Sequence, residues 1–280
     1  MTLGEHVAST TTRTTAQPTK KEARKHVFFG ASALLFVASA LITSVWSTSM
    51  SAMGEMLMPG DWSMSMTWMR MPGQTWLGAA ASFLGMWVVM MVAMMLPSLV
   101  TMLWNYRTAV SGANDRHIGW RTSLVAAGYF FVWTVFGVAI FPLGIALAAV
   151  AMQQPAISRG VPLAIGVLIL IAGALQFTAW KGRQLACCRD ESTPRIAVPA
   201  SAGSALRHGV QLGLRCGPCC ANLMVILLVA GVMNLGAMAV VTAAITVERL
   251  APAGEHAARA IGAIVVGSAL LLITRAIGLA

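Results

Sequence analysis

Seven long apolar runs constrain the fold of this 280-residue chain more than any other feature of its sequence. An α-helix needs ~20 apolar residues to cross a bilayer, and most of the runs approach or exceed that length. The chain is 58% hydrophobic and 10% charged, with a mean hydropathy of +0.75, which excludes a soluble globular protein. The runs are Val27–Trp46, Leu77–Leu103, Thr122–Ala151, Val161–Trp180, Gly209–Gly231, Leu235–Leu250 and Ala260–Gly278. We predict an all-α, polytopic transmembrane helical bundle of about seven spans, with six and eight as alternatives because the sixth run is short and the third is long.

The formal net charge of +10 is distributed in a way that predicts membrane orientation. Basic residues gather before the first run and near the ends of the second, fourth and sixth runs, whereas the opposite loops carry only Arg70 and Arg159. By the positive-inside rule, the N-terminus lies in the cytoplasm and the C-terminus lies outside. Nucleic-acid binding is not expected, because the basic residues do not cluster with stacking aromatics. We therefore predict a multi-pass protein of the bacterial cytoplasmic (inner) membrane, with the lipid bilayer as its first partner.

The runs divide the chain into four parts. Residues 1–26 are polar and rich in Thr and Lys, which predicts a disordered cytoplasmic tail. Residues 27–46 form an anchoring helix, residues 47–76 an extracytoplasmic Met-rich loop, and residues 77–280 a metal-binding membrane domain. A secretory signal is the alternative for residues 27–46, but the run is long for a signal core and no clean cleavage site follows it. The Met-rich loop lies outside under either interpretation.

Methionine crowds the first of these outer loops. Packing alone rarely requires so many methionines in one place, and this segment of Ser, Thr, Gly, Pro and Trp has little aliphatic core. The eight methionines recur as M-x-x-M and M-x-M, and are Met50, Met53, Met56, Met58, Met64, Met66, Met69 and Met71. Thioether sulfur is a soft, uncharged donor that selects Cu(I) among the biological metals. We predict that the segment captures copper; the alternative is a flexible hydrophobic flap, or methionines spread along a membrane interface.

Six further methionines lie in or at the end of the second apolar run. At ~100° per residue, Met86, Met90 and Met94 share one helical face. The others, Met91, Met95 and Met102, lie on an adjacent face. Lipid contact does not call for methionine, so the array indicates either a packed interior or a relay of soft ligands, and both interpretations stay open. Pro97 predicts that this helix kinks or ends there.

Three of the five cysteines fall within the string Arg215-Cys-Gly-Pro-Cys-Cys. On a helix, Cys216, Cys219 and Cys220 share one face, and Met224 lies one turn further along it. Three thiols and a thioether supply most of a soft-metal site. Pro218 suits the first turn of a helix that starts there. Arg215 is expected to face a cavity or the cytoplasmic interface and to favour thiolate over thiol.

The Cys-Gly-Pro-Cys tetrapeptide also raises two alternatives. It is the active-site sequence of thioredoxin, so a membrane thiol–disulfide oxidoreductase that uses Cys216 and Cys219 is the first alternative. Thioredoxin chemistry places this motif after a strand, and no strand pattern precedes it here. Inert cysteine, packed as a small hydrophobe, is the second alternative.

For the other polar residues in the apolar runs we predict structural roles rather than metal binding. Gln176, Asn222 and Asn234 are expected to cross-link helices or line a path. Glu248 is expected at the cytoplasmic interface, in a solvated ion pair with Arg249. The five histidines have no paired spacing, so a histidine-based zinc or haem site is not expected. Nucleotide-binding and hydrolase motifs are not found in the sequence, so we expect no nucleotide cofactor.

Four blocks of sequence carry a resemblance to a known family: Met86–Pro97, Gln176–Lys181 followed by Cys187, Gly213–Cys220, and Gly231–Met238 with Glu248. Together they resemble the bacterial family of predicted metal-binding integral membrane proteins, a domain of unknown function, over roughly Leu77 to Leu250. The resemblance implies a multi-pass inner-membrane protein with a metal site and no established reaction. Where that family has separated cysteines after the lysine, this chain has adjacent Cys187 and Cys188, so the pair is not assigned to a site.

These observations lead to one functional hypothesis and two alternatives. We expect a soft-metal protein, with Cu(I) as its metal, that captures, relays or transports metal at or across the membrane. The outer methionines capture the metal, and the thioethers of the second run relay it: Met86, Met90, Met94 and Met95. The last site, which holds the metal, consists of Cys216, Cys219, Cys220 and Met224. A periplasmic metal chaperone or a membrane assembly partner is expected, and no catalytic residue. The alternatives are the thiol–disulfide oxidoreductase and a structural subunit of a membrane assembly.

Overall fold

The computed structural model describes residues 20–52, 56–59, 62–64, 68–70, 73–110, 117–190 and 201–278. As predicted, the described chain is almost entirely helical. Its helices are α1 (Lys20–Ala52), α2 (Trp76–Val110), α3 (Ile118–Gln153), α4 (Pro155–Leu175), α5 (Ala179–Asp190), α6 (Ala202–Ala230), α7 (Leu235–Leu250) and α8 (Gly254–Ala276). Two strands of three residues each, β1 (Met56–Met58) and β2 (Trp62–Met64), form a hairpin that the sequence did not predict.

Six helices of the described chain are long and apolar enough to cross a membrane, and they are α1, α2, α3, α4, α6 and α8. The predicted sixth span coincides with α7, which has 16 residues. At 1.5 Å per residue such a helix rises ~24 Å, less than the ~30 Å hydrocarbon layer. The predicted fourth span, residues 161–180, is placed too far toward the C-terminus: α4 begins at Pro155 and ends at Leu175, and a turn over residues 176–178 leads into the short helix α5.

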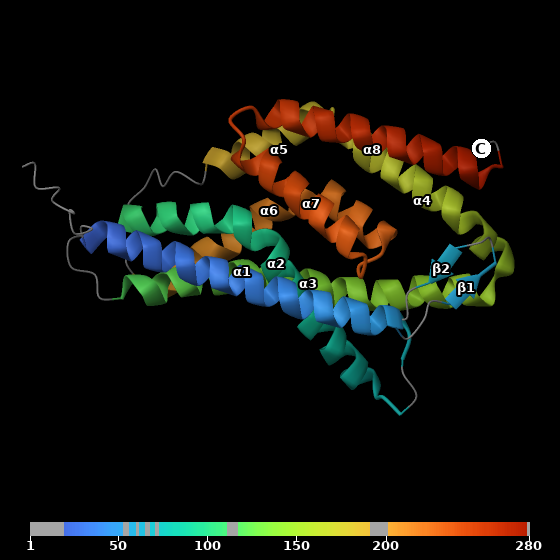
Figure 1. Cartoon of the computed structure of the whole chain (residues 1–280), viewed down its shortest axis with the longest axis horizontal. Helices are drawn as coiled ribbons and strands as arrows, with labels where there is room; N and C mark the ends of the chain where they lie inside the picture. The colour runs from blue at the N-terminus through green and yellow to red at the C-terminus, as the bar shows by residue number, and fades with distance from the viewer. Residues whose placement is uncertain are drawn as a thin grey trace, which may run out of the picture.

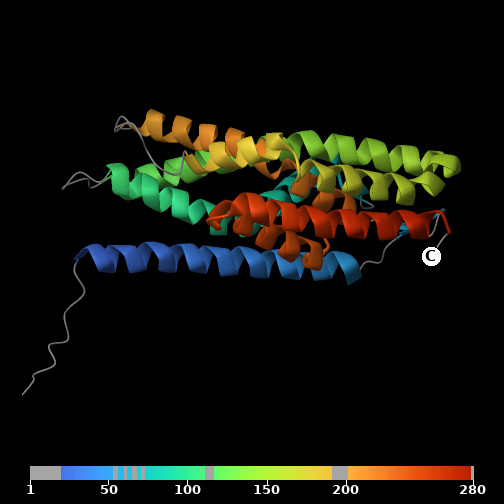
Figure 2. The same ribbon diagram turned by 90° about the horizontal axis from the view of Figure 1, so that it is seen from above.

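The long helices run side by side along the longest axis of the molecule (Figures 1 and 2). The starts of α1, α3 and α6 and the end of α2 lie at one end of the bundle. The hairpin, the α3–α4 junction and the end of α8 lie at the other end. Helix α1 begins at Lys20, so the last residues of the predicted disordered tail are helical; residues 1–19 lie outside the described chain.

The hairpin places part of the Met-rich loop against the end of α3. In its antiparallel register Met56 pairs with Met64, and Met58 pairs with Trp62. Met58 is buried in a small cluster with Ala148 and Ala151 of α3. Of the remaining loop methionines, Met50 at the end of α1 and Met69 are half-buried, whereas Met53, Met66 and Met71 lie outside the described residues.

The α2 methionines form the centre of the core. All six are buried, with Met91 and Met95 completely enclosed: Met86, Met90, Met91, Met94, Met95 and Met102. This confirms that they line a packed interior, while a relay of metal along them stays a prediction. Helix α2 bends between its two halves (Figure 1). Pro97 lies inside the helix, and its missing N–H and bulky ring weaken the helical hydrogen-bond ladder.

Helices α3 and α6 pack backbone to backbone along a stripe of glycines. A Cβ atom on Gly209 would overlap the Val125 carbonyl, and one on Gly213 would lie 2.9 Å from Cβ of Val132. Gly217, one turn further along, packs on the ring of Phe136. Small residues at this four-residue spacing allow membrane helices to approach closely. The close approach brings the cysteine string of α6 next to the aromatic residues of α3.

The junction between α6 and α7 is a turn with its own local signals. Gly231 ends α6 with a φ of +104°, a backbone conformation that residues other than glycine rarely adopt. Asn234 caps α7, because its side-chain oxygen accepts a hydrogen bond from the Ala237 N–H at 3.0 Å. Asn234 therefore caps a helix, and the expected role of cross-linking helices or lining a path is wrong.

Candidate metal centre

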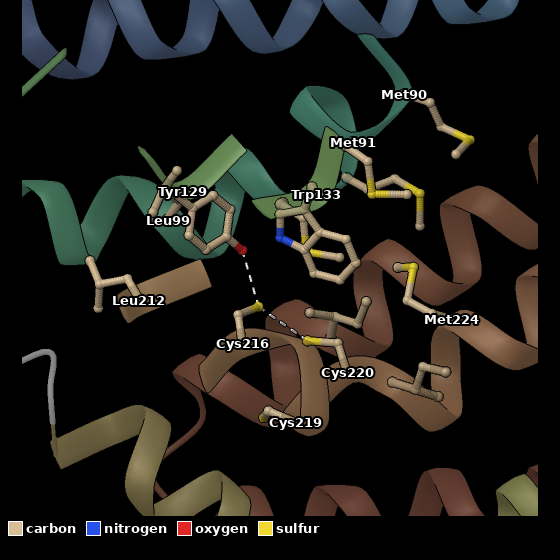
Figure 3. Close-up of a cluster of buried hydrophobic side chains, with 14 of the residues drawn as sticks. Met90, Met91, Leu99, Tyr129, Trp133, Leu212, Cys216, Cys219, Cys220 and Met224 are labelled. Carbon is tan, nitrogen blue, oxygen red and sulfur yellow. Dashed lines mark hydrogen bonds between the residues drawn. The ribbon is translucent and has the colours of Figure 1, made fainter. Parts of the chain in front are cut away.

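The predicted sulfur face of α6 is buried in the centre of the bundle. Cys216, Cys219 and Cys220 are each at most 1% exposed, and Met224 is buried one turn further along (Figure 3). Helix α6 continues through Pro218, so the expected helix start at this residue is wrong. Because proline has no N–H, it leaves the Leu214 carbonyl without its helical donor.

Cys216 is the most highly connected thiol of the face. The Tyr129 hydroxyl of α3 donates a hydrogen bond to its sulfur at 3.0 Å, and the sulfurs of Cys216 and Cys220 are 3.6 Å apart (Figure 3). Arg249 of α7 also donates to the Cys216 sulfur, from Nη1 at 3.3 Å. Three helices thus converge on one sulfur atom.

Arg249 connects the cysteines to the methionine helix. Its Nη1 donates to the Ser98 hydroxyl at 3.0 Å, and its Nη2 donates to the Met102 sulfur at 3.2 Å. The expected solvated ion pair between Glu248 and Arg249 is wrong, because both side chains are buried and point to different partners.

Arg215, which we expected beside the thiols, lies elsewhere. Its side chain is exposed and donates to the sulfur of Cys187, with an Nη1–Sγ distance of 3.7 Å. The cation next to Cys216 is instead Arg249, and sequence reasoning missed its role. The available signal was an arginine inside an apolar run, where a charged residue usually faces the bundle interior.

A second polar layer lies behind the cysteines. The Lys181 ammonium of α5 is 2.7 Å from the Glu248 carboxylate, and both side chains are buried. The Gln176 amide donates to the other carboxylate oxygen at 2.7 Å. Lys181 also donates to the Cys219 carbonyl at 2.7 Å and to the Asn222 side-chain oxygen at 3.3 Å. Gln176 and Asn222 therefore link helices, as predicted.

The adjacent cysteines of α5 have different environments. Cys187 is exposed, whereas Cys188 is buried and donates to the Arg215 carbonyl at a sulfur–oxygen distance of 3.3 Å. A hydrogen bond to Cys219, together with burial, raises the pKa of the Cys188 thiol well above its usual range. Cys188 thus joins the buried thiols, although nothing in the sequence distinguishes it from Cys187.

The remaining predicted ligands divide between the centre and the far end of the molecule. The predicted ligands Met90 of α2 and Met224 of α6 come from different helices, and the Trp133 indole of α3 lies between Tyr129 and these methionines in this view (Figure 3). The indole N–H of Trp133 is buried with no hydrogen-bond partner among the described residues. The hairpin methionines lie at the opposite end of the bundle from the start of α6 (Figure 1).

The candidate metal centre contains one pair of close thiols, Cys216 and Cys220, rather than a complete set of metal ligands. Within the described ranges, no three His, Cys, Asp or Glu side chains are grouped so as to hold one metal ion. A surface cavity of about 430 Å³ opens beside Lys181 and Gln176, with Arg183, Glu255 and Arg259 in its lining. Its lining contains neither cysteine nor methionine, so this cavity is not the sulfur site.

Comparison with known proteins relates the chain to copper handling. The model of the family described as "PpoB2: Copper chaperone" matches residues 84–272, which is more than half of the chain. The match includes α6, the cysteine string, Arg249 and most of α2, and it supports the metal-related part of the resemblance noted above. No curated protein and no solved structure matches the chain.

Proposed function

The chain belongs to the PpoB2 copper chaperone family, and on this premise we propose that it is a membrane protein that binds Cu(I) at Cys216 and Cys220. The observation that carries the proposal is the buried pair of sulfurs 3.6 Å apart, with the Met102 thioether on the far side of Arg249. Cu(I) prefers thiolate and thioether sulfur, whereas Mg²⁺, Ca²⁺ and Mn²⁺ prefer oxygen.

Binding would proceed with loss of the thiol protons. Cysteine binds metal as thiolate, so each bound sulfur releases a proton. The Tyr129 hydroxyl and the Arg249 guanidinium already donate to the Cys216 sulfur, and both contacts stabilise negative charge on it. Cys219 and Cys188 lie behind this pair as further soft donors, available to a metal that changes its ligands during transfer.

The methionines complete the proposed route. The outer loop would gather Cu(I) weakly and exchange it fast, because its thioethers are uncharged. The buried thioethers of Met86, Met90, Met94 and Met95 would lead from the loop end of α2 toward the thiols. Met224 would add a donor on α6. The chain would act in the inner membrane of a bacterium and receive copper from a periplasmic chaperone or pass it to an assembly partner.

The thiol–disulfide alternative has weaker support than metal binding. It requires Cys216 and Cys219 to pair, whereas Cys216 faces Cys220 and Cys219 hydrogen bonds with Cys188. A purely structural role would not explain why the hydrogen-bond donors Tyr129 and Arg249 converge on the Cys216 sulfur. We therefore propose a copper-binding role rather than an enzymatic one.

Copper competition on purified protein tests the proposal. The reduced protein in detergent is titrated with Cu(I) against a colorimetric chelator, together with Cys216→Ser, Cys220→Ser and, as matched control, Cys187→Ser. Loss of one of two sulfur ligands should weaken retention at least ~10-fold in the first two variants. The exposed Cys187 should be dispensable. X-ray absorption that shows only oxygen or nitrogen around copper would overturn the proposal, as would equal retention in all four proteins.

A further inference from the structure

One positive charge in the interior has no carboxylate to balance it. The buried charged side chains of the described residues are Lys181, Glu248 and Arg249. Lys181 and Glu248 form an ion pair and cancel each other. Arg249 donates to a hydroxyl, a thioether sulfur and the Cys216 sulfur, and it forms no ion pair with a carboxylate of the described residues. Arginine stays protonated inside proteins, so this charge is permanent.

A permanent charge at this depth is expensive unless an anion faces it. The groups that can become anionic here are the thiols, which deprotonate when they bind metal. Two thiolates and one monovalent cation carry a net charge of −1, which the guanidinium beside Cys216 neutralises. Two thiolates and one divalent cation are already neutral, so the same guanidinium leaves an excess of +1. In a medium of low dielectric, this difference strongly favours the monovalent ion.

We propose that Arg249 sets the charge selectivity of the cysteine site, admitting soft monovalent cations and disfavouring soft divalent ones. This inference rests on the proposed binding of Cu(I) by Cys216 and Cys220 and adds the reason why divalent metals are refused. Thiolates alone do not provide such discrimination, since they also bind zinc tightly. Arg249 acts through its charge and is a positioning residue rather than a ligand.

The fold holds the guanidinium firmly in place. Ser98 and Met102, one helical turn apart on α2, accept from its two Nη atoms. The backbone at the end of α7 is fixed by Arg189, whose guanidinium donates to the carbonyls of Glu248, Ala251 and Pro252. The charge therefore cannot easily turn away when a divalent ion enters.

The test compares two soft probes on the purified, reduced, full-length protein. Ag(I) represents monovalent and Cd(II) divalent cations, and the measured quantity is the ratio of their dissociation constants by competition. Arg249→Met removes the charge, and Arg249→Lys keeps it. Ser98→Asp places a carboxylate beside the intact arginine, and Ser98→Asn is its uncharged counterpart. If Arg249→Met does not fold, the comparison of Ser98→Asp with Ser98→Asn still tests the inference.

The preference for Ag(I) over Cd(II) should fall at least ~100-fold in Arg249→Met and Ser98→Asp, the scale of an altered buried charge. It should stay within a few-fold of the natural protein in Arg249→Lys and Ser98→Asn. An unchanged ratio in a folded charge variant would overturn the inference, and so would equal losses in the charge-conserving variants. Failure of the natural protein to bind Ag(I) at all would instead remove the proposed copper site.

Discussion

The Lys181 ammonium lies 2.7 Å from the Glu248 carboxylate, although the two residues belong to helices well separated in the chain. Around this pair, Gln176 holds the carboxylate and Asn222 accepts from the ammonium. Lys181 also reaches the carbonyl of Cys219, so the ion pair is tied to the backbone of the sulfur helix. One polar layer therefore connects the end of α4 with α5, α6 and α7.

Breaking this ion pair on one side should destabilise the protein. Lys181→Met or Glu248→Gln leaves a buried charge unpaired, which typically costs ~3–5 kcal/mol. The double variant should recover a large part of the loss, because it leaves no unpaired charge. Chemical unfolding in detergent measures these free energies, with the exposed Arg183→Met as control, expected within ~0.5 kcal/mol of the natural protein. Additive losses in the double variant would contradict the pairing.

The glycine stripe should tolerate no side chain at its closest contact. Gly209→Ala places a methyl group against the Val125 carbonyl, which forces α3 and α6 apart. We expect lower thermal stability and weaker copper retention, since Tyr129 is then withdrawn from Cys216. Gly203→Ala is the matched control, because nothing lies within 4 Å of its added atom and alanine favours helix by ~1 kcal/mol. Equal behaviour of the two variants would disprove the close packing.

The thioether of Met102 should matter for copper but not for folding. Met102→Leu keeps the approximate volume, so the free energy of unfolding should change by less than ~1.5 kcal/mol. It removes the sulfur that accepts from Arg249, and copper retention should fall about 10-fold, as for other groups that support metal ligands. Met86, which is also buried and lies nearer the start of α2, serves as the comparison in the variant Met86→Leu. Equal effects of both changes on retention would argue against a special position of Met102.

The outer methionines should matter only when copper is scarce. Replacing Met50, Met53, Met56 and Met58 by Leu deletes four sulfurs while keeping hydrophobicity and approximate volume. Growth and cellular copper content should decline at low external copper and recover when copper is added, because the cysteine site keeps its ligands. Unchanged copper handling at every concentration would mean that these methionines serve packing or the membrane interface. Copper binding by the cysteine site would not be affected by that result.

The number of spans should be odd. If the 16-residue α7 crosses the membrane together with the six longer helices, the two termini lie on opposite sides. A reporter that is active only outside the cytoplasm, fused after Ala280, should then be active, and the same reporter fused before Met1 should be silent. Activity at neither terminus would favour six spans, with α7 enclosed within the bundle.

Local patterns predicted the helices better than they predicted the site. A helix can be predicted from the apolar run that forms it and from the turn residues that flank it, all within one stretch of chain. The run Leu235–Leu250, for example, coincides with α7. The i, i+3, i+4 spacing likewise placed Cys216, Cys219 and Cys220 on one buried face. Helix α5 was missed because its composition is that of a polar loop, and it becomes helical where it packs beneath α6 and α7.

The partners of the cysteines could not be predicted from sequence, because they come from distant elements. Tyr129 reaches Cys216 where the glycine stripe brings the backbones of α3 and α6 together, and Arg249 reaches it from α7. Glu248 and Arg249 adjoin in sequence, which suggested an exposed ion pair, yet each points to a different buried partner. Such contacts depend on the path of the whole chain.

The glycine contact between α3 and α6 has a mechanical consequence for the proposed exchange of metal at the cysteine site. Helices that meet backbone to backbone move as one body, so Tyr129, Cys216 and Cys220 keep their mutual geometry during any exchange. The other wall of the site, with Cys188 and Arg249, rests on the two shortest helices of the described chain and is held there by side-chain contacts. If the proposed transfer of copper takes place, we expect a recipient to gain access by displacing α5 or α7, while α3 and α6 stay in place.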